Sequence, residues 1–319
     1  MPKLTFALCS YNRADRLVKL LPEMRSLVCP VDFEVLVVDN NSSDATFQVV
    51  SQIAATPGPP VRYVLERQQG IPYARNRALA EAMDSDFLVF IDDDEIPHLG
   101  LLAAAVDALT TRGARCAGGK VKVDIKPELR PKWLVDDLLG FLAEVDYGDE
   151  AFWIKDHTTP VWMANIAYDM SLFRDDPDLR FDLRYNRSGH GVGGGSDAIM
   201  FKELLDRKVP MLYCPSMVVQ HRVDAWRLHR RYFLKLHFVS GRKYGQFQSG
   251  DYVRTLFGVP PFMMSQAFVH WLRAAGMYLS HKPGALRQAM NGAHATGLVW
   301  GRVMSHLEHR RAQQTQGRA

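Results

Sequence analysis

Residues 87–94 are Phe-Leu-Val-Phe-Ile-Asp-Asp-Asp, five apolar residues followed directly by three carboxylates. A continuous apolar run of this length is typical of a strand that is buried on both faces of a sheet. Runs of the same character occur upstream, at Leu4–Cys9, Phe33–Val38 and Val61–Leu65. The sequence therefore predicts four buried strands before the acidic cluster.

Segments with helical spacing of their apolar residues separate these strands. Arg16–Leu27 has apolar residues three and four positions apart, Asp44–Ala55 follows a polar turn, and Gly70-Ile71-Pro72 opens a helix that runs to about Met83. The alternation of strand and helix predicts an α/β fold, with a mostly parallel, Rossmann-like sheet and helices on both faces. Ligands bind such sheets beyond the carboxyl ends of the strands.

Three polar clusters follow predicted strands, namely Ser10-Tyr11-Asn12, Asp39 and Asp92 to Asp94. We expect them to converge at one edge of the sheet. Hard divalent cations such as Mg²⁺ or Mn²⁺ prefer carboxylate and phosphate oxygens. Side chains alternate along an extended segment, so Asp92 and Asp94 would point the same way, one toward a ribose and the other toward a metal. A solvated acidic turn, or a cap for a helix after Pro97, is the structural alternative.

The composition is that of a folded protein with a sizeable core, because 47% of the 319 residues are hydrophobic and 23% are charged. The net charge is only +4, but acidic clusters gather in the first half and basic residues in the second. Four cysteines without a C-x-x-C pair suggest reduced thiols. With no secretion signal and no long apolar stretch, we expect a cytoplasmic protein.

Four motifs in the first hundred residues resemble those of family 2 glycosyltransferases with the GT-A fold. In chain order they are Leu8-Cys9-Ser10-Tyr11-Asn12-Arg13, Val37-Val38-Asp39-Asn40-Asn41-Ser42-Ser43-Asp44, Gly70-Ile71-Pro72-Tyr73-Ala74-Arg75-Asn76 and the D-x-D segment Phe90-Ile91-Asp92-Asp93-Asp94. The resemblance covers residues 3 to 245 and weakens after the D-x-D segment. It implies a GT-A catalytic domain over residues 1–225, with a nucleotide-binding half, 1–115, and an acceptor half, 116–225. Residues 226–319 are expected to form a basic, helical C-terminal region.

The resemblance implies donor-binding roles for Ser10, Asn12, Arg13, Asp39, Arg75, Asp92, Asp93 and Asn165. Ser10 and its neighbours would line the nucleobase pocket, Asp39 would hydrogen-bond the base, and Asp92 would contact the ribose region. Arg75 would lie near the diphosphate, where its fork suits bidentate contacts, or form an ion pair with Asp92 in the free protein. Asp94 would bind the metal.

The stretch Gly193-Gly194-Gly195-Ser196-Asp197 resembles the family's G-G-E-D motif, whose carboxylate is the general base. Ser196 stands at the glutamate position, which leaves Asp197 as the candidate base or, alternatively, as a helix cap. Asn165 resembles the segment beneath the sugar, or is a satisfied buried amide. His221, at the end of a predicted strand, is a candidate for approaching the metal or diphosphate, although a lone histidine is more often structural.

The family implies an inverting transfer of a sugar from a nucleotide-sugar, with uridine expected as the base, to a glycan or lipid-linked acceptor in polysaccharide synthesis. The implied cofactor is Mn²⁺ or Mg²⁺, and no nucleic-acid partner is expected. Two other classes remain open: a non-catalytic nucleotide-sugar-binding subunit, and a nucleotidyltransferase, although Ser10 to Arg13 lacks the glycine of a phosphate loop.

Basic and apolar residues interleave over Trp226–Tyr244 and again around Leu286–Leu307. Basic amphipathic helices of this kind suit peripheral contact with the inner face of a membrane. A helix pair packed against the catalytic domain with a solvated basic face is the alternative.

Overall fold

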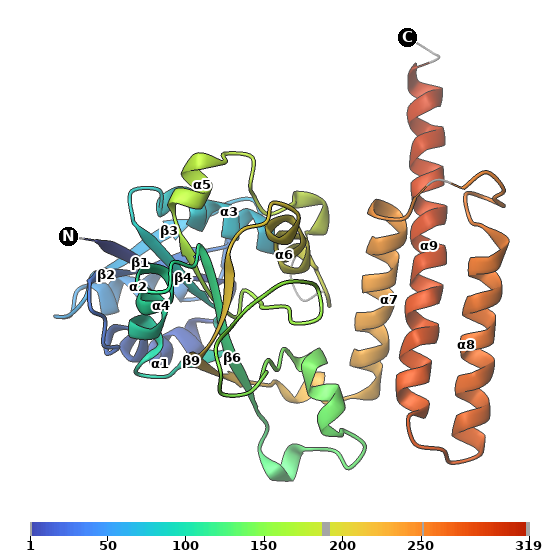
Figure 1. The fold of residues 1–319 in the computed structure, drawn as a ribbon, viewed down its shortest axis with the longest axis horizontal. Coiled ribbons are helices and arrows are strands. Elements are labelled where there is room, and N and C mark those ends of the chain that lie inside the picture. The colour runs from blue at the N-terminus through green and yellow to red at the C-terminus, as the bar shows by residue number, and fades with distance from the viewer. Residues whose placement is uncertain (1, 187–191, 251, 317–319) are drawn as a thin grey trace. The chain divides into compact units, whose positions relative to one another are not determined.

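The computed structural model describes residues 2–186, 192–250 and 252–316 (Figure 1). The chain divides into two compact units. The first comprises residues 1–190 and 195–224, and the second comprises residues 191–194 and 225–319.

The first unit is built on a mixed sheet whose strands lie in the order β3-β2-β1-β4-β8-β6-β9-β5, with β7 beside β9. The strands are β1 (Lys3–Ser10), β2 (Asp32–Asp39), β3 (Val61–Leu65), β4 (Phe87–Ile91), β5 (Glu95–Pro97), β6 (Cys116–Asp124), β7 (Phe152–Trp153), β8 (Asn165–Asp169) and β9 (Met211–Arg222). The first four are parallel, and β8 runs antiparallel to both β4 and β6. The sheet is therefore parallel over β1 to β4, as the sequence predicts, and mixed beyond β4.

Helices cover both faces of this sheet (Figure 1). They are α1 (Ala14–Arg25), α2 (Thr46–Ala54), α3 (Ile71–Glu81), α4 (Leu101–Thr110), α5 (Ser171–Asp175) and α6 (Ser196–Asp206). Right-handed crossovers place α1 and α2 on one face, because the chain moves in one direction from β1 to β3. The return from β3 to β4 reverses that direction and places α3 on the other face.

The register of the parallel strands brings their polar ends to one level. Ser10 at the end of β1 pairs with Asp39 at the end of β2, and Ala7 pairs with Phe90 in β4. Most side chains of β1, β2 and β4 are apolar and buried, which fixes this register because a one-residue slip would turn the core side chains outward. The carboxyl ends of β1, β2 and β4 thus form one polar edge.

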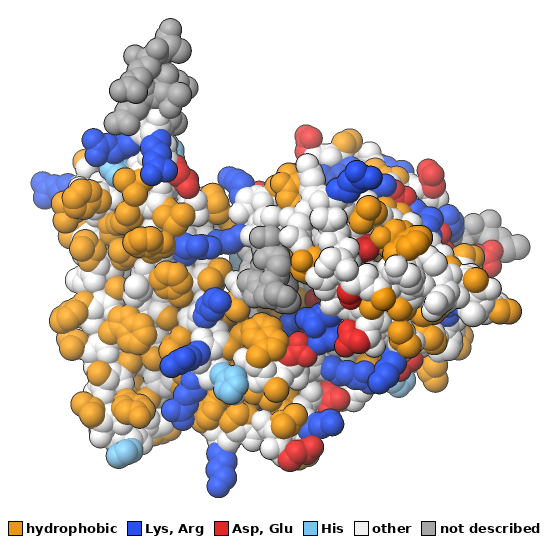
Figure 2. All heavy atoms as spheres, turned by 180° about the vertical axis from the view of Figure 1, so that it is seen from behind, with side chains coloured by type: hydrophobic (Ala, Val, Ile, Leu, Met, Phe, Trp, Pro, Cys, Tyr) orange, Lys and Arg blue, Asp and Glu red, His pale blue; other side chains and the backbone are white. Residues whose placement is uncertain are grey.

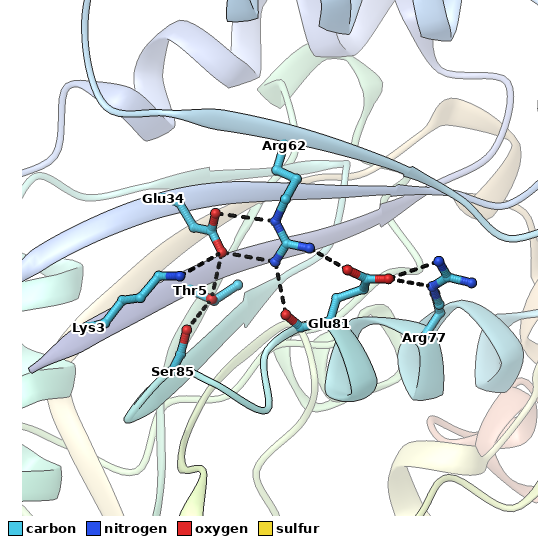
Figure 3. Close-up of polar contacts among 7 residues, drawn as sticks. All are labelled: Lys3, Thr5, Glu34, Arg62, Arg77, Glu81 and Ser85. Atoms are coloured by element: carbon cyan, nitrogen blue, oxygen red, sulfur yellow. Dashed lines mark hydrogen bonds and ion pairs between the residues drawn. The ribbon is translucent and has the colours of Figure 1, made fainter.

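A polar network joins the amino-terminal part of the sheet to α3 (Figure 3). Arg62 of β3 donates from Nε and Nη2 to the two carboxylate oxygens of Glu34 on β2, at 3.2 and 2.9 Å, and its Nη1 pairs with Glu81 of α3. Lys3 lies 3.8 Å from Glu34, and the Thr5 hydroxyl donates to Glu34 at 3.1 Å. The Glu34 side chain is only 12% exposed, so its charge depends on these partners.

Replacing Glu34 by glutamine is expected to lower the free energy of unfolding at neutral pH by about 1–2 kcal/mol. Burial raises the pKa of Glu34, but the hydrogen bonds and charge of Arg62, with Lys3 and Thr5, outweigh this and lower it below its ordinary value of 4.5. A carboxyl whose pKa is lower in the folded chain stabilises the fold above its ordinary pKa, and this stability is lost as the pH falls through the folded value. Urea denaturation between about pH 5 and about pH 3 should therefore show a steeper loss for the wild type than for Glu34→Gln. Parallel curves would rule out Glu34 as the titrating group.

The second unit contains three long helices, α7 (Arg230–Phe247), α8 (Pro261–Leu279) and α9 (Ala285–Gln316). Glycines bring α7 and α9 into backbone contact. A Cβ at Gly241 or Gly245 of α7 would lie 2.0 or 2.2 Å from a backbone oxygen of α9, and one at Gly297 or Gly301 of α9 would lie 2.0 Å from a backbone oxygen of α7. Two G-x-x-x-G pairs therefore face each other, a spacing that allows helix backbones to approach closely.

Replacing Gly297 by alanine is expected to destabilise this helical unit by about 2–3 kcal/mol, because the new methyl group must push α7 and α9 apart. Gly276 in α8 is the matched control, since a Cβ there has nothing within 4 Å. Gly276→Ala should be neutral or stabilising by up to about 1 kcal/mol through helix propensity. Thermal denaturation followed by circular dichroism compares the two, and equal melting curves would contradict the close packing.

Among the described residues, no helix combines the length and the apolar character needed to cross a bilayer. All four cysteines are unpaired.

Candidate active site

Carboxylates crowd the end of β4. The chain turns directly after the strand, with the Glu95 amide donating to the Asp92 carbonyl at 3.2 Å, instead of continuing extended as the sequence suggests. The turn brings one carboxylate oxygen each from Asp92, Asp94 and Glu95 to within 4.8 Å of one another. Three oxygen donors at this spacing fit a hard divalent cation such as Mg²⁺ or Mn²⁺. Glu95 joins this group although the sequence analysis assigned it no role.

Asp93 is not part of the group of Asp92, Asp94 and Glu95. Its Oδ2 accepts a hydrogen bond from the Ser10 hydroxyl at 2.8 Å, which ties β4 to β1. Burial, and then the charge of Asp94, raise the pKa of Asp93 to about 7, against the lowering effect of Ser10 and Arg13. Asp93 and Ser10 therefore form a partly buried contact next to the carboxylate group.

The negative charges of neighbouring carboxylates also disfavour the ionised form of Asp92. Burial raises the pKa of Asp92; Arg75 opposes this shift, while the charges of Asp94 and Asp197 add to it. A bound cation would relieve this repulsion, which is a physical reason for these residues to hold one.

Two side chains from distant parts of the chain flank Asp94. Arg16 of α1 and His221 of β9 each place a nitrogen 3.6 Å from its Oδ2. Arg16 also donates to Asp224 at 2.6 Å, and Arg13 lies 3.8 Å from the Asp224 carboxylate. His221 reaches the site because β9 pairs antiparallel with β5, which sets His221 opposite Glu95. The histidine expected near the metal thus lies beside Asp94.

Arg75 links three parts of the site from the first turns of α3. It is buried, and its Nη2 lies 3.6 Å from Oδ1 of Asp92, so the ion pair considered from the sequence is present. Its Nη1 donates to the Ser196 hydroxyl at 3.2 Å, and its guanidinium packs over the Phe181 ring. The serine that replaces the expected glutamate is therefore an Arg75 partner.

Asp197 lies in the first turn of α6 and is not the helix cap. Gly195 occupies the cap position with φ of 85°, a left-handed conformation that glycine adopts without strain. Among the described residues, the Asp197 Oδ1 accepts a 3.2 Å hydrogen bond from the backbone amide of its neighbour Ala198. The charge of Asp197 also contributes to raising the pKa of Asp92.

Asp39 and its neighbours form the other end of the polar edge. The buried Asp39 carboxylate accepts from the Ser42 amide at 2.9 Å and from the Tyr63 hydroxyl at 2.7 Å. Each carboxylate oxygen can accept a second hydrogen bond, so contact with a base remains available. Asn12, at φ of 52°, accepts a hydrogen bond from the Ser43 amide at its side-chain oxygen, and its own backbone amide donates to the Ser42 hydroxyl at 2.9 Å. These contacts tie the first two motifs into one loop pair.

Asn165 has a mainly structural position. At the start of β8 it pairs with Ile91, and its Nδ2 donates to the carbonyls of Lys120 and Met217 at 2.9 and 3.0 Å. These carbonyls lie where the β6–β9 register shifts, so Asn165 bridges an irregularity in the sheet. Its Oδ1 is buried and accepts no hydrogen bond from the described residues.

Sequence reasoning missed Glu95, Arg16, Tyr63 and Asp224. The one signal available for Arg16 was its position one helical turn after Arg13, which places both on one face of α1. Tyr63 and Asp224 are brought to the edge by strand register and by the course of β9, which no local pattern reveals.

Comparisons with known proteins bear on the family and the fold of the chain. Residues 5–176, just over half of the chain, match Glycosyl transferase family 2. Glycosyltransferase AglE of Haloferax volcanii is 30% identical over 123 residues, which is 38% of this chain and 40% of AglE. Succinoglycan biosynthesis protein ExoM of Rhizobium meliloti is 24% identical over 240 residues, 75% of this chain and 72% of ExoM. The chain thus aligns with less than half of AglE.

Among solved structures, the mannosyltransferase PcManGT from Pyrobaculum calidifontis, in complex with GDP-Man and Mn²⁺, has a TM-score of 0.59 at 19% identity, covering 94% of this chain and 87% of that one. S. aureus TarS in complex with UDP has a TM-score of 0.55 at 16% identity, covering 97% and 92%. These likenesses confirm the expected GT-A fold. The four motifs, the fold and the matched segment agree, and the chain belongs to glycosyl transferase family 2.

Proposed function

We propose that this chain is a metal-dependent, inverting glycosyltransferase that moves a sugar from a nucleoside-diphosphate donor to a glycan or lipid-linked acceptor. The observation that carries this proposal is the group of Asp92, Asp94 and Glu95 at the carboxyl end of β4, with Arg75 beside it. The negatively charged oxygens of a diphosphate would be complementary to a divalent cation at these carboxylates and to the Arg75 guanidinium. Uridine is the proposed base, and peripheral contact with the cytoplasmic face of a membrane is part of the proposal.

The transfer makes one bond and breaks another at the anomeric carbon. The acceptor oxygen attacks this carbon while its proton passes to the Asp197 carboxylate. The bond from the carbon to the diphosphate oxygen breaks, and its electron pair leaves with the nucleoside diphosphate. Attack from the face opposite the leaving group inverts the configuration.

The chain's own residues prepare this step. Arg75 would bind diphosphate oxygens through its fork, with Ser196 and Phe181 holding it in place. Asp39 and the Ser10–Asn12 turn would hold the nucleoside, and Asp92 the ribose region. A divalent ion held by Asp94, with Asp92 and Glu95, would supply charge stabilisation for the leaving diphosphate.

Thermal denaturation with nucleotides tests donor binding. UDP together with Mn²⁺ is expected to raise the melting temperature by several degrees, because a ligand bound only by the folded state stabilises it, whereas each alone should do less. GDP with Mn²⁺ serves as the comparison for the base. Equal stabilisation by UDP with and without Mn²⁺ would contradict the metal-dependent site.

Turnover separates an enzyme from a non-catalytic binding subunit. If the chain is an enzyme, we expect it to release free nucleoside diphosphate from a UDP-sugar. Slow hydrolysis of the donor can be measured in place of transfer while the acceptor is unknown. A subunit that only binds would show the thermal shift without any release.

A further inference from the structure

Charge is segregated along the chain. Residues 225–319 contain 14 Lys and Arg against two acidic residues, Asp251 and Glu308, a formal charge of +12. Because the whole chain carries +4, residues 1–224 carry −8. Between Tyr252 and Leu307 the sequence contains no Asp or Glu. A unit with this charge is attracted to an anionic surface and repelled by a second copy of itself.

Helix α8 presents a long apolar stripe that the sequence analysis did not single out. Positions separated by 4, 7, 8, 14 and 15 residues lie on one face of a helix. In α8 they are Met264, Phe268, Trp271, Leu272, Tyr278 and Leu279, with exposed fractions from 41% for Trp271 to 78% for Leu279. The only Lys, Arg, Asp or Glu in the helix is Arg273.

The neighbouring face of α8 already has its partner. Met263 and Ala274 are buried there. Trp271 lies at the border between this face and the stripe: its indole donates to Thr296 of α9 at 2.9 Å and its ring packs on the Gly292 backbone, while the residue stays 41% exposed. These contacts fix which side of the helix faces α9. The stripe is left exposed by the described residues, and Figure 2 shows hydrophobic side chains gathered along the helical unit with Lys and Arg among them.

We propose that the α8 stripe, defined by Met264, Phe268, Trp271, Leu272, Tyr278 and Leu279, lies in the interface of an anionic bilayer. The inference rests on the peripheral membrane contact in the proposed function and assigns that contact to one helix. Apolar side chains enter the acyl boundary, while Trp and Tyr suit the headgroup level. Lys282, just after α8, and the net positive charge of the unit favour anionic headgroups.

Neither helix expected from the sequence to contact a membrane offers a comparable face. The glycine-rich faces of α7 and α9 pack against each other. The charge of the unit argues against a second copy covering the stripe, and an uncharged apolar face is poorly suited to nucleic acid. A helix that is apolar on one side and too polar overall to span a bilayer suits a position in the plane of the interface.

Sedimentation of the full chain with vesicles tests this assignment. We expect binding to vesicles of phosphatidylcholine and phosphatidylglycerol in a ratio of about 3:1, and weaker binding to phosphatidylcholine alone. Phe268→Ser with Leu272→Ser, which keeps the charge, should lower the partition coefficient at least about tenfold. Val18→Ser with Leu99→Ser is the matched control, because both side chains are over half exposed in the first unit, and it should bind like the wild type.

Wild-type vesicle binding by the Phe268/Leu272 variant would overturn the proposal. So would a lipid-free dimer, measured by light scattering, that this variant converts to monomer. Tyr278→Ser with Leu279→Ser tests the other end of the stripe should the first variant fail to fold by circular dichroism. Vesicle binding needs no donor, so its loss leaves the transferase proposal standing, and absent donor binding leaves the membrane surface intact.

Discussion

Replacing Asp94 by alanine is expected to abolish the manganese dependence of nucleoside-diphosphate binding and to reduce sugar transfer by about three orders of magnitude, on the order of 4 kcal/mol. Asp94 supplies one of three carboxylates that lie within 4.8 Å of one another. Without it, the cation loses a ligand, and Arg16 and His221 lose the anion that they flank. Calorimetric titration of UDP with and without Mn²⁺, followed by a donor-turnover assay, measures both effects.

Two other aspartates serve as controls for the loss of a carboxylate that lies outside the proposed metal site. Asp93→Asn should keep the manganese dependence, because Asp93 faces Ser10 and lies outside the carboxylate group. Asp107→Ala removes an exposed carboxylate on α4 whose partner is Arg112, and should leave binding and turnover unchanged. The metal site would be refuted if the affinity for the nucleotide changed neither on addition of manganese nor on loss of Asp94.

The parallel part of the sheet could be predicted because its signals are local. Each of the first four strands is a mostly apolar run that ends in a polar turn, and the alternation with helices predicts the parallel order. Ser10, Asp39 and Asp92 therefore reach one edge by topology alone. The GT-A fold and the family were predicted from the same motifs and are confirmed.

The carboxylate group itself depends on non-local contacts. The sequence places Asp92 and Asp94 together by alternation along a strand, but a turn brings them together in the structure and recruits Glu95. His221 reaches Asp94 only because β9 runs antiparallel to β5. Such pairings between distant segments leave no periodic signal in a single sequence.

In the helical region, the local pattern indicated membrane contact for segments that pack on each other. Interleaved basic and apolar residues suggested this contact for the segments that form α7 and α9, whereas the glycines of these two helices pack them against each other. Apart from Arg273, α8 has no Lys, Arg, Asp or Glu, so its sequence lacks the charged face by which an amphipathic helix is usually recognised. Its exposed stripe becomes apparent only when the partner face on α9 is known.

Replacing Asp197 by asparagine is expected to lower turnover by about 10²–10⁴-fold and to leave donor affinity unchanged. The amide keeps the size of the side chain and loses the ability to accept a proton from the acceptor hydroxyl. Because proton transfer occurs only in the transition state, the loss should fall on kcat and leave the dissociation constant for UDP and Mn²⁺ as in the wild type. Single-turnover transfer and calorimetry measure the two quantities separately.

The far end of the same helix offers the control. Asp206 pairs with Lys202 on the solvent side of α6, so Asp206→Asn repeats the chemical change away from the carboxylate group and should retain turnover. Full transfer activity in Asp197→Asn would exclude this residue as the base. A parallel loss of donor affinity would instead assign Asp197 to donor binding, since its charge also acts on Asp92. The split between kcat and affinity thus decides which role the first turn of α6 has.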